Sequence, residues 1–341
     1  MITISVGIPT TRSATLGTAI RSVLAQTRGD WELMVIGQGP PEAEVELRDA
    51  TAAAASGDPR VVYTHLTRRG VSRARNACVS LARGEILAFL DDDCEAAPTW
   101  LETIAAAFAG DAELGVVGGA VMSVGRVGPF SYCPTASPAE AVYEPLVTPQ
   151  RPPDGWDWIG ANFAIRADVV ALIGPYDESL GGGAEFPAAE DTDYKLRLEA
   201  LGVRMRCTPR SVVFHSSGTR VGRAALRCQR NYDLGNGAMC AKQTMNGDPR
   251  GVIYLRGALR RSLTEWATRL RPYRLPQDLR RSFWREVGYR RCLRNFEVDA
   301  MGLLRRREEA NHSAPAANDL QAMRSRRDAG RPGVQRQRCR R

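Results

Sequence analysis

Three kinds of pattern are absent from this sequence of 341 residues, and each absence excludes a class of protein. The eight cysteines form no CxxC pair and no finger spacing, so they are interpreted as reduced and unpaired, and no structural zinc site is expected. No window reaches about 18 uninterrupted apolar residues, which argues against a membrane-spanning helix. The N-terminus lacks the basic and long apolar regions of a signal peptide, so we expect a cytoplasmic protein.

The glycine motifs of two nucleotide-binding classes are missing as well. Gly7-Ile8-Pro9-Thr10 follows the first predicted strand and does not match GxGxxG, which argues against a dehydrogenase, and no P-loop of an NTPase is present. A sugar nucleotidyltransferase needs a glycine-rich loop at the same place, whereas Pro9-Thr10-Thr11-Arg12 contains no glycine. This last class is kept as an alternative.

Charge is divided unevenly along the chain. The net charge of +9 combines −5 over the first 250 residues with +14 over residues 251–341, where there are 23 arginines and no lysine. Such a segment can meet anionic lipid, nucleic acid or an acidic partner, or it can be a solvated tail. It contains few interleaved aromatic residues and no recognisable nucleic-acid module, so nucleic acid is not an expected partner.

The apolar pattern predicts strands and helices in alternation. Strands are predicted at residues 2–8, 31–36, 61–66, 85–90, 116–121, 163–166 and 211–214, and helices at residues 13–26, 72–82 and 194–201. This order is typical of an α/β fold with a largely parallel, buried sheet and helices on both faces. Residues 126–158, rich in proline, glycine and serine, are expected to form an irregular loop near a site.

From residue 224 onward the pattern is helical and basic. One predicted helix face carries Leu255, Leu259, Leu263, Trp266 and Leu270, and the pattern continues with Leu279, Phe283, Val287 and Leu293. We therefore divide the chain into an α/β domain at 1–222, a basic amphipathic helical extension at 223–307 and a disordered Arg-rich tail at 308–341. The apolar stripes either pack on the α/β domain or dock on an anionic membrane, and both interpretations stay open.

Three consecutive aspartates, Asp91-Asp92-Asp93, follow the strand predicted at 85–90. Ligands of parallel sheets bind beyond the carboxyl ends of the strands, so these carboxylates are expected to face a crevice. Adjacent carboxylates repel one another unless a cation neutralises them, and Mg²⁺ or Mn²⁺ does so through oxygen ligands while also bridging diphosphates. The alternative is an acidic helix N-terminus.

A second acidic cluster and a histidine lie later in the chain. Glu190-Asp191-Thr192-Asp193 precedes the helix predicted at 194–201, where a carboxylate can face the site and act as a base; helix capping is the alternative. His215 is one of three histidines and follows the strand predicted at 211–214. It is a candidate metal ligand or proton shuttle, with a structural histidine as the alternative.

Six motifs in this order resemble those of the family 2 glycosyltransferases of the GT-A fold. They are Val6-Gly7-Ile8-Pro9-Thr10, Arg73-Ala74-Arg75-Asn76, Leu90-Asp91-Asp92-Asp93, Gly160-Ala161-Asn162, Tyr176-Asp177-Glu178 and Glu190-Asp191-Thr192-Asp193. The resemblance covers residues 3–220 and implies a Rossmann-like, mostly parallel sheet flanked by helices. It also implies an inverting enzyme that moves a sugar from a nucleotide-diphosphate-sugar to an acceptor hydroxyl.

The resemblance further implies roles for single residues. The nucleotide-sugar would be bound by Pro9, Thr10, Arg12, Gln38, Arg73, Asn76, Asp91, Asp92, Gly160, Ala161, Asn162 and Glu190, with the three residues at 160–162 lining the sugar pocket. Asp93 and His215 would hold Mn²⁺ or Mg²⁺, with Asp91 beside them. Asp191 would be the catalytic base that removes the proton of the acceptor hydroxyl.

One position departs from the family pattern. After the second strand many members have an acidic pair that binds the base, whereas this chain has Gly37-Gln38. UDP-, GDP- and dTDP-linked donors therefore all stay open. The sequence does not identify the acceptor; a glycan or a lipid-linked molecule of cell-envelope or polysaccharide synthesis is expected, which the enzyme would reach as a peripheral protein at the inner face of the membrane. The alternative to an enzyme is a non-catalytic carbohydrate-binding or partner-binding module on the same fold.

Overall fold

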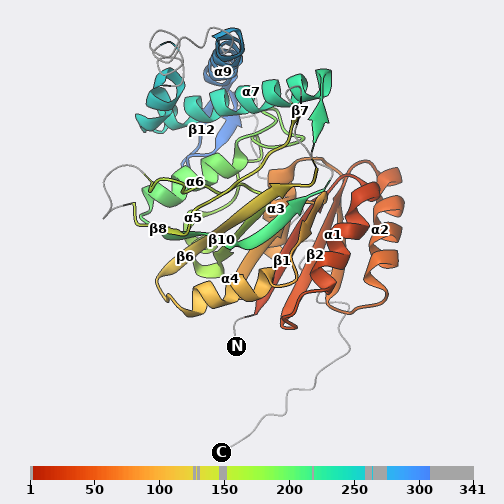
Figure 1. Ribbon diagram of the computed structural model, residues 1–341. Coiled ribbons are helices and arrows are strands. Elements are labelled where there is room, and N and C mark those ends of the chain that lie inside the picture. The colour runs from red at the N-terminus through yellow and green to blue at the C-terminus, as the bar shows by residue number, and fades with distance from the viewer. Residues whose placement is uncertain are drawn as a thin grey trace, which may run out of the picture.

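The structure, a computed structural model, describes residues 3–125, 128, 131–145, 152–216, 219–257, 263 and 275–307. An α/β body is built from residues 4–215, and the C-terminal helices lie together at one end of it (Figure 1). The tail predicted at 308–341 lies outside the described residues, as do Leu259, Trp266 and Leu270 of the predicted apolar face.

The central sheet has the strand order β3-β2-β1-β4-β9-β6-β10-β5. Its members are β1 (Ile4–Thr10), β2 (Trp31–Gln38), β3 (Val61–Leu66), β4 (Ile86–Leu90), β5 (Cys94–Ala96), β6 (Leu114–Ser123), β9 (Asn162–Arg166) and β10 (Arg204–His215). The strands β3, β2, β1, β4, β6 and β10 run in one direction, while β9 runs antiparallel to its neighbours β4 and β6. Every residue of β1 and β2 is buried, as expected for strands that are covered on both faces.

Two hydrophobic clusters, one on each face of the sheet, hold the flanking helices. One face packs against α1 (Ser13–Leu24), α2 (Pro41–Ala55) and α4 (Trp100–Ala109), and the other against α3 (Val71–Leu81), α5 (Ala167–Ile173) and α6 (Glu190–Ala200). Strand β2 contributes Leu33 and Val35 to the first cluster and Met34 and Ile36 to the second, because side chains alternate across a strand. The predicted α/β fold with helices on both faces is confirmed.

The irregular segment predicted at 126–158 contains two short strands among its described residues. Strand β8 (Ala141–Tyr143) pairs with β10, and β7 (Ser131–Tyr132) pairs with β11 (Arg220–Val221), next to the start of the extension.

The extension begins with α7 (Arg223–Met245), which packs along α9 (Leu275–Asn295). Residues 296–306 then form a β-hairpin, β12 (Phe296–Val298) with β13 (Leu304–Arg306), where the sequence predicted a helical segment. The Asp299 carboxylate accepts hydrogen bonds from the amides of Met301 and Leu303, and this local turn ends the helical pattern.

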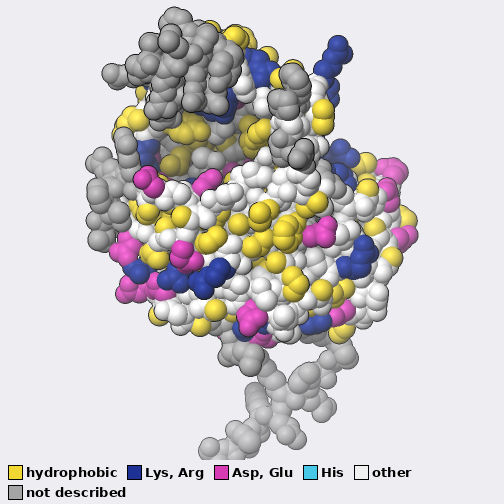
Figure 2. Space-filling view, in the orientation of Figure 1, with side chains coloured by type: hydrophobic (Ala, Val, Ile, Leu, Met, Phe, Trp, Pro, Cys, Tyr) yellow, Lys and Arg dark blue, Asp and Glu magenta, His cyan; other side chains and the backbone are white. Residues whose placement is uncertain are grey.

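The extension is packed on the body and also has exposed apolar side chains. Leu180 and Phe186 of the body share a hydrophobic cluster with Ala238, Cys292 and Phe296 of the extension, so the packing interpretation holds for this part of the chain. Figure 2 shows a hollow on one face between the body and the extension, with hydrophobic side chains inside it. None of the helices in the described ranges is long and apolar enough to cross a membrane.

Candidate active site

The three aspartates lie at the carboxyl end of β4, and β5 rather than a helix follows them. The next helix, α4, begins only at Trp100, so these acids are not the N-terminus of a helix. Asp92 and Asp93 are each 5% exposed. Burial of adjacent carboxylates requires neutralising partners. In the structure the side chains of Arg12, Arg75 and His215 are these partners.

Arg12 and Thr10 join the end of β1 to this cluster. Thr10 Oγ1 donates a hydrogen bond of 2.7 Å to Asp92 Oδ2. Arg12 pairs with Asp92 and also with Asp93, where its Nη2 lies 2.9 Å from Oδ2. Asp92 is thus bound by protein groups on both oxygens, while the side chain of Arg12 is 43% exposed and can also reach a ligand.

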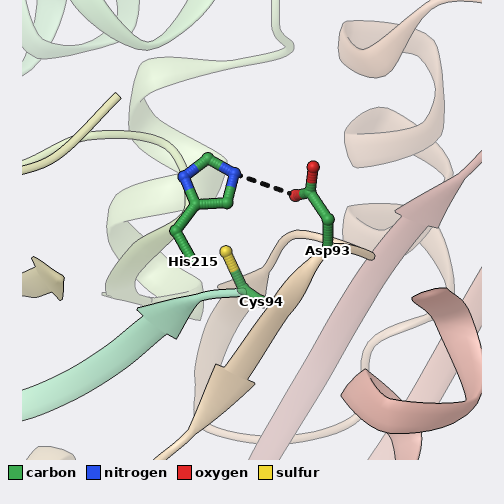
Figure 3. A group of neighbouring side chains, drawn as sticks. All are labelled: Asp93, Cys94 and His215. Carbon is green, nitrogen blue, oxygen red and sulfur yellow. Dashed lines mark hydrogen bonds and ion pairs between the residues drawn. The ribbon is translucent and has the colours of Figure 1, made fainter. Parts of the chain in front are cut away.

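His215 lies directly beside Asp93 (Figure 3). Strand β10 pairs with β5 so that His215 is opposite Cys94, and this register brings His215 Nε2 to 3.1 Å from Asp93 Oδ1. Although burial opposes it, the hydrogen bond and charge of His215 lower the pKa of Asp93 to about 2, and Asp93 in turn raises the pKa of His215 to about 9. The structure therefore brings together the two predicted metal ligands.

The donor set around Asp93 fits a divalent cation. His215 Nδ1 lies 3.0 Å from the carbonyl oxygen of Pro134, which fixes the ring so that Nε2 faces Asp93. In the structure His215 Nε2 and Asp93 Oδ1 form a hydrogen bond and ion pair, and a cation bound here would replace the proton between them. Cys94 also lies within reach, but burial and the nearby aspartates raise the pKa of its thiol and disfavour the thiolate. Imidazole and carboxylate together suit Mn²⁺ better than Mg²⁺.

Arg75 links the first acidic cluster to the second. Its side chain is 2% exposed, and its guanidinium lies 3.7 Å from Asp91 and 2.9 Å from Glu190, while Nη2 donates to the carbonyl oxygen of Gly160 at 3.0 Å. The sequence motif contained Arg75, but no role was predicted for it. One local feature could have indicated that Arg75 is buried. It lies three positions before Cys78 and therefore on the same face of α3, and that face is buried.

Asp191 and Glu190 lie in the first turn of α6, where neither residue caps the helix. The N-cap position is Ala189, so capping by Asp191 or Thr192 is excluded. Asp191 Oδ2 instead accepts a hydrogen bond of 2.9 Å from the amide of Gly160, across the chain. Burial, and to a smaller extent the charge of Asp191, raise the pKa of Glu190 despite the neighbouring Arg75.

The predicted sugar-pocket residues have different surroundings. Gly160 lies against Arg75, where an added Cβ would come within 2.5 Å of Nη2, and Ala161 is buried in the core cluster behind it. Asn162 is fully buried: its Oδ1 accepts from Trp100 Nε1 at 2.8 Å, and its Nδ2 donates to two carbonyl groups. In this conformation Asn162 has no free group for a sugar hydroxyl.

Asn162→Ala is accordingly expected to lower the free energy of unfolding by about 3 kcal/mol, because the indole N–H of Trp100 and two carbonyl oxygens lose their partner. Urea unfolding followed by circular dichroism measures the change. Asn246→Ala is the matched control, since that amide donates one exposed hydrogen bond to Gly302 and should contribute less than about 1 kcal/mol. Equal losses in both variants would contradict the assignment.

The predicted nucleotide contacts on α3 and β2 are engaged with the protein. Asn76 binds the backbone N–H and C=O of Tyr176, and Arg73 pairs with Glu178. Gln38, which is 2% exposed, accepts a hydrogen bond of 2.7 Å from the amide of Gly70. These contacts order the rim of the site. Pro9, the remaining predicted contact, is buried within β1. The roles of these residues in binding a nucleotide remain predictions.

Comparison with known proteins bears on the fold and the family. A family model described as Glycosyl transferase family 2 matches residues 5–173. The chain is 27% identical over 172 residues to the glucosyl-dolichyl phosphate glucuronosyltransferase of Haloferax volcanii, an alignment that covers 48% of this chain and 51% of that protein. The chain thus spans about half the length of this relative.

Two solved structures share the fold. The mannosyltransferase PcManGT from Pyrobaculum calidifontis, in complex with GDP-Man and Mn²⁺, superposes with a TM-score of 0.56 at 15% identity and covers 84% of this chain and 87% of its own. TarS 1–349 from S. aureus, in complex with UDP-GlcNAc, gives 0.56 at 16% identity and covers 92% and 98%. At these identities the likeness establishes the fold, and the GT-A class expected from the sequence is confirmed.

Proposed function

We propose, from the premise that the chain belongs to glycosyl transferase family 2, that it transfers a sugar from a nucleotide-diphosphate-sugar to an acceptor hydroxyl with inversion. The observation that carries the proposal is the junction at Arg75. Through this residue Asp91, at the end of β4, is linked to Glu190 and Gly160, and Gly160 in turn binds Asp191. Two acidic clusters that are about a hundred residues apart in sequence therefore lie around one site.

In this proposal the donor diphosphate lies beside Asp93 and His215. These two residues would hold Mn²⁺ or Mg²⁺, with Asp91 near them, and the bound ion would neutralise charge on the diphosphate leaving group. Arg12 already contacts Asp92 and Asp93, and its exposed guanidinium can add a hydrogen bond to the same phosphates.

Asp191 acts as the general base on the other side of the sugar. The acceptor oxygen forms a bond to the anomeric carbon from the face opposite the diphosphate, its proton passes to Asp191, and the bond from the anomeric carbon to the phosphate oxygen breaks. This single displacement gives inversion and needs no covalent intermediate. The backbone amides of Gly160 and Thr192 each donate to Asp191 and so orient its carboxylate.

A thermal-shift comparison of UDP-, GDP- and dTDP-sugars with and without Mn²⁺ tests donor binding. A donor at about 100 times its Kd is expected to stabilise the protein by about 2.7 kcal/mol, a rise in Tm of roughly 5 °C, because it binds only the folded state. The same sugars without the nucleotide are the control. If no donor raises Tm more with Mn²⁺ than with EDTA, the proposed donor class is wrong.

We also propose that the extension docks on an anionic membrane to reach a lipid-linked acceptor. Ile253 is 66% exposed and Phe283 is 60% exposed, and Arg256 and Arg281 are exposed near them in sequence. Tyr254 lies 5.5 Å from the Arg285 guanidinium, so the segment at 253–256 lies beside α9. Exposed apolar side chains with interleaved arginines suit an interface of lipid and anionic headgroups.

Co-sedimentation with vesicles of phosphatidylglycerol and phosphatidylcholine measures this docking. We expect salt-sensitive pelleting with the anionic vesicles and little with phosphatidylcholine alone. Ile253→Ser and Phe283→Ser should each weaken the partition coefficient by about tenfold, since each removes apolar area from the interface. Leu172→Ser, at a residue of α5 that is 64% exposed, is the matched control. If pelleting changes neither with salt nor with either substitution, the docking proposal is wrong, and the extension serves only to pack on the body.

A further inference from the structure

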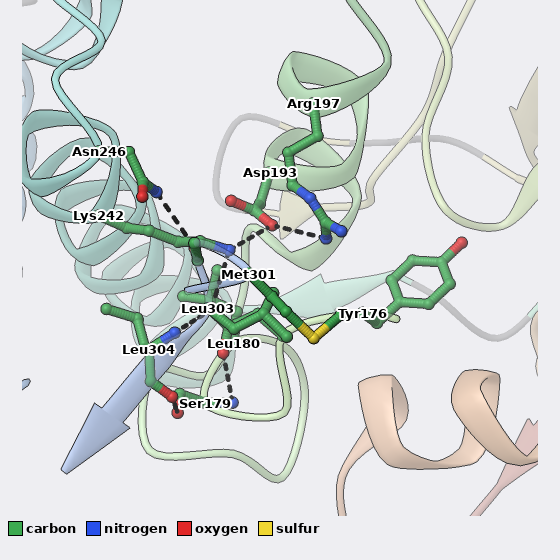
Figure 4. A network of polar contacts seen from close by, with 12 residues as sticks. Tyr176, Ser179, Leu180, Asp193, Arg197, Lys242, Asn246, Met301, Leu303 and Leu304 are labelled. Atoms are coloured by element: carbon green, nitrogen blue, oxygen red, sulfur yellow. Dashed lines mark hydrogen bonds and ion pairs between the residues drawn. The ribbon is translucent and has the colours of Figure 1, made fainter. Parts of the chain in front are cut away.

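Lys242 of α7 is a fully buried cation placed between two carboxylates of the body. Its side chain is 0% exposed, and its Nζ lies 2.9 Å from Asp177 Oδ2 and 2.8 Å from Asp193 Oδ2. Figure 4 shows the contact with Asp193. The sequence contains only one other lysine, Lys195, among 47 basic residues. A compact ammonium group can be shared between two converging carboxylates, whereas a planar guanidinium needs more room.

The two carboxylates lie at the two ends of one segment. Asp177 belongs to the motif that follows α5, and Asp193 lies in the first turn of α6, two residues after Asp191. Asp177 also accepts hydrogen bonds from the amides of Ser179 and Leu304, and Asp193 accepts one from Gln243. Side chains and backbone of the extension therefore hold both ends of the segment 177–193.

The middle of this segment is attached to α3, next to Arg75. Ser72 Oγ donates a hydrogen bond of 2.6 Å to the carbonyl oxygen of Leu180, and the amide of Val71 donates one of 2.8 Å to that of Gly182. The segment is thus fixed on one side by α3 and on the other by α7, and Glu190 and Asp191 project from it into the site.

Helix α7 also packs on the residues directly before Glu190. An added Cβ at Gly235 would come within 2.5 Å of the carbonyl oxygen of Ala188, so the two backbones are in close contact. Ala189 has a left-handed φ of 72°, which is unfavourable for alanine, and it packs against Met239 and Cys240 of α7. Such a conformation persists only where the surroundings impose it, and here α7 does so.

A buried ion pair contributes little net stability compared with well-packed apolar residues, although removing one partner is costly. The arrangement around Lys242 therefore needs another reason. We infer that Lys242 is a positioning residue for sugar transfer: by holding Asp177 and Asp193 it fixes the first turn of α6 and with it the carboxylate of Asp191. This inference rests on the proposed function, because it assigns Lys242 to the placement of the proposed base.

Lys242→Met tests the inference, since methionine keeps the length of the side chain and removes the charge. We expect kcat to fall about 100-fold, as a small displacement of a catalytic group produces. The binding stoichiometry should not change and the donor Kd with Mn²⁺ should change by less than about tenfold, because Asp93 and His215 lie at the ends of β4 and β10 and only Glu190 of the predicted donor contacts lies in the turn that Lys242 holds. Calorimetric titration with the donor supplies both values. An unchanged kcat, or one that falls only in proportion to the stoichiometry, would overturn the inference.

A double variant and a control separate position from stability. The double variant Lys242→Met, Asp177→Asn removes one charge of each sign, and Asp193 keeps Gln243 and Arg197 as partners. We expect this variant to fold, because no buried charge is left unpaired, and to keep the low kcat. Arg285→Met breaks a buried pair with Asp233 inside the extension, 3.0 Å in length, and should lower Tm but not kcat. Wild-type kcat in the folded double variant would defeat the inference.

Hydrogen exchange gives a readout that does not depend on activity. The amide of Asp193 is bonded to the carbonyl oxygen of Ala189 in the first turn of α6. Exchange in peptides that cover residues 189–200 should be about tenfold faster in Lys242→Met than in Arg285→Met when both are measured well below their Tm. Equal protection would contradict the role of Lys242 even if transfer were never observed, whereas inactivity of the wild-type protein alone would count only against the proposed function.

Discussion

Asp191→Asn is expected to lower kcat for sugar transfer by about 10²- to 10⁴-fold, the usual contribution of a general base. Asparagine keeps the size of the side chain and can still accept the hydrogen bond from the Gly160 amide, but it cannot take a proton. The donor Kd in the presence of Mn²⁺ should therefore stay within about twofold. Product formation from a radiolabelled donor and an acceptor extract measures the rate, and donor hydrolysis without acceptor provides a second measurement.

A matched control for this substitution exists on α5. Asp168 also accepts a hydrogen bond of 2.7 Å from the amide of the next residue, as Asp191 does, but it is exposed and lies at the start of a different helix. Asp168→Asn should leave kcat unchanged. If Asp191→Asn turns over as fast as this control, the base has been assigned to the wrong residue.

Asp93→Ala is expected to abolish the Mn²⁺-dependent part of donor binding. Changes in the outer shell of a metal site typically cost about 10- to 100-fold in affinity, so removing a ligand should weaken Mn²⁺ binding by about 100-fold or more. Calorimetry with Mn²⁺ alone and the Tm rise with donor plus Mn²⁺ both report the loss. His215→Gln should have an effect in the same direction, because its Nε2 faces the same position.

The control for the metal site must also break an aspartate–arginine pair. Asp111 binds Arg204 Nε at 2.9 Å at the start of β6, much as Asp93 binds Arg12. Asp111→Asn should reduce stability slightly while Mn²⁺ affinity stays the same. Unaltered Mn²⁺ affinity in Asp93→Ala would instead remove these residues from the metal site.

The sheet was predictable because its strands are continuous apolar runs, and such runs mark strands that are buried on both faces. Helix α2 (Pro41–Ala55) escaped prediction, since only Leu47, Thr51, Ala54 and Ala55 of its residues are buried and the rest show no clear stripe. The hairpin at 296–306 was also missed. It depends on the Asp299 turn and on packing against α7, which a helical periodicity cannot reveal.

The candidate site was predictable in part, for a similar reason. Carboxylates that directly follow a buried strand reach the ligand edge of the sheet, so Asp93 could be placed from its position alone. The approach of His215 to Asp93 requires the pairing of β5 with β10, which was not predicted; its place after a strand and the family resemblance suggested only that His215 is a metal ligand. Arg75 and Lys242 had no such signal: the acidic partners of Arg75 lie 16 and 115 positions away and those of Lys242 lie 49 and 65 positions away. Periodicity does not distinguish a buried charge from an exposed one.

The reversed direction of β9 determines what kind of group reaches the active site. A strand that ran with β4 would deliver side chains from its last residues to this edge. Because β9 runs the other way, with Asn162 opposite Leu90, the chain enters the edge just before the strand begins, at Gly160. There the main chain itself faces the site, and one peptide unit on each side of Gly160 offers a donor to Asp191 and an acceptor to Arg75. Gly160 contributes only main-chain atoms to these two contacts, so its half of each contact is fixed by chain topology, while Asp191 and Arg75 supply the side chains.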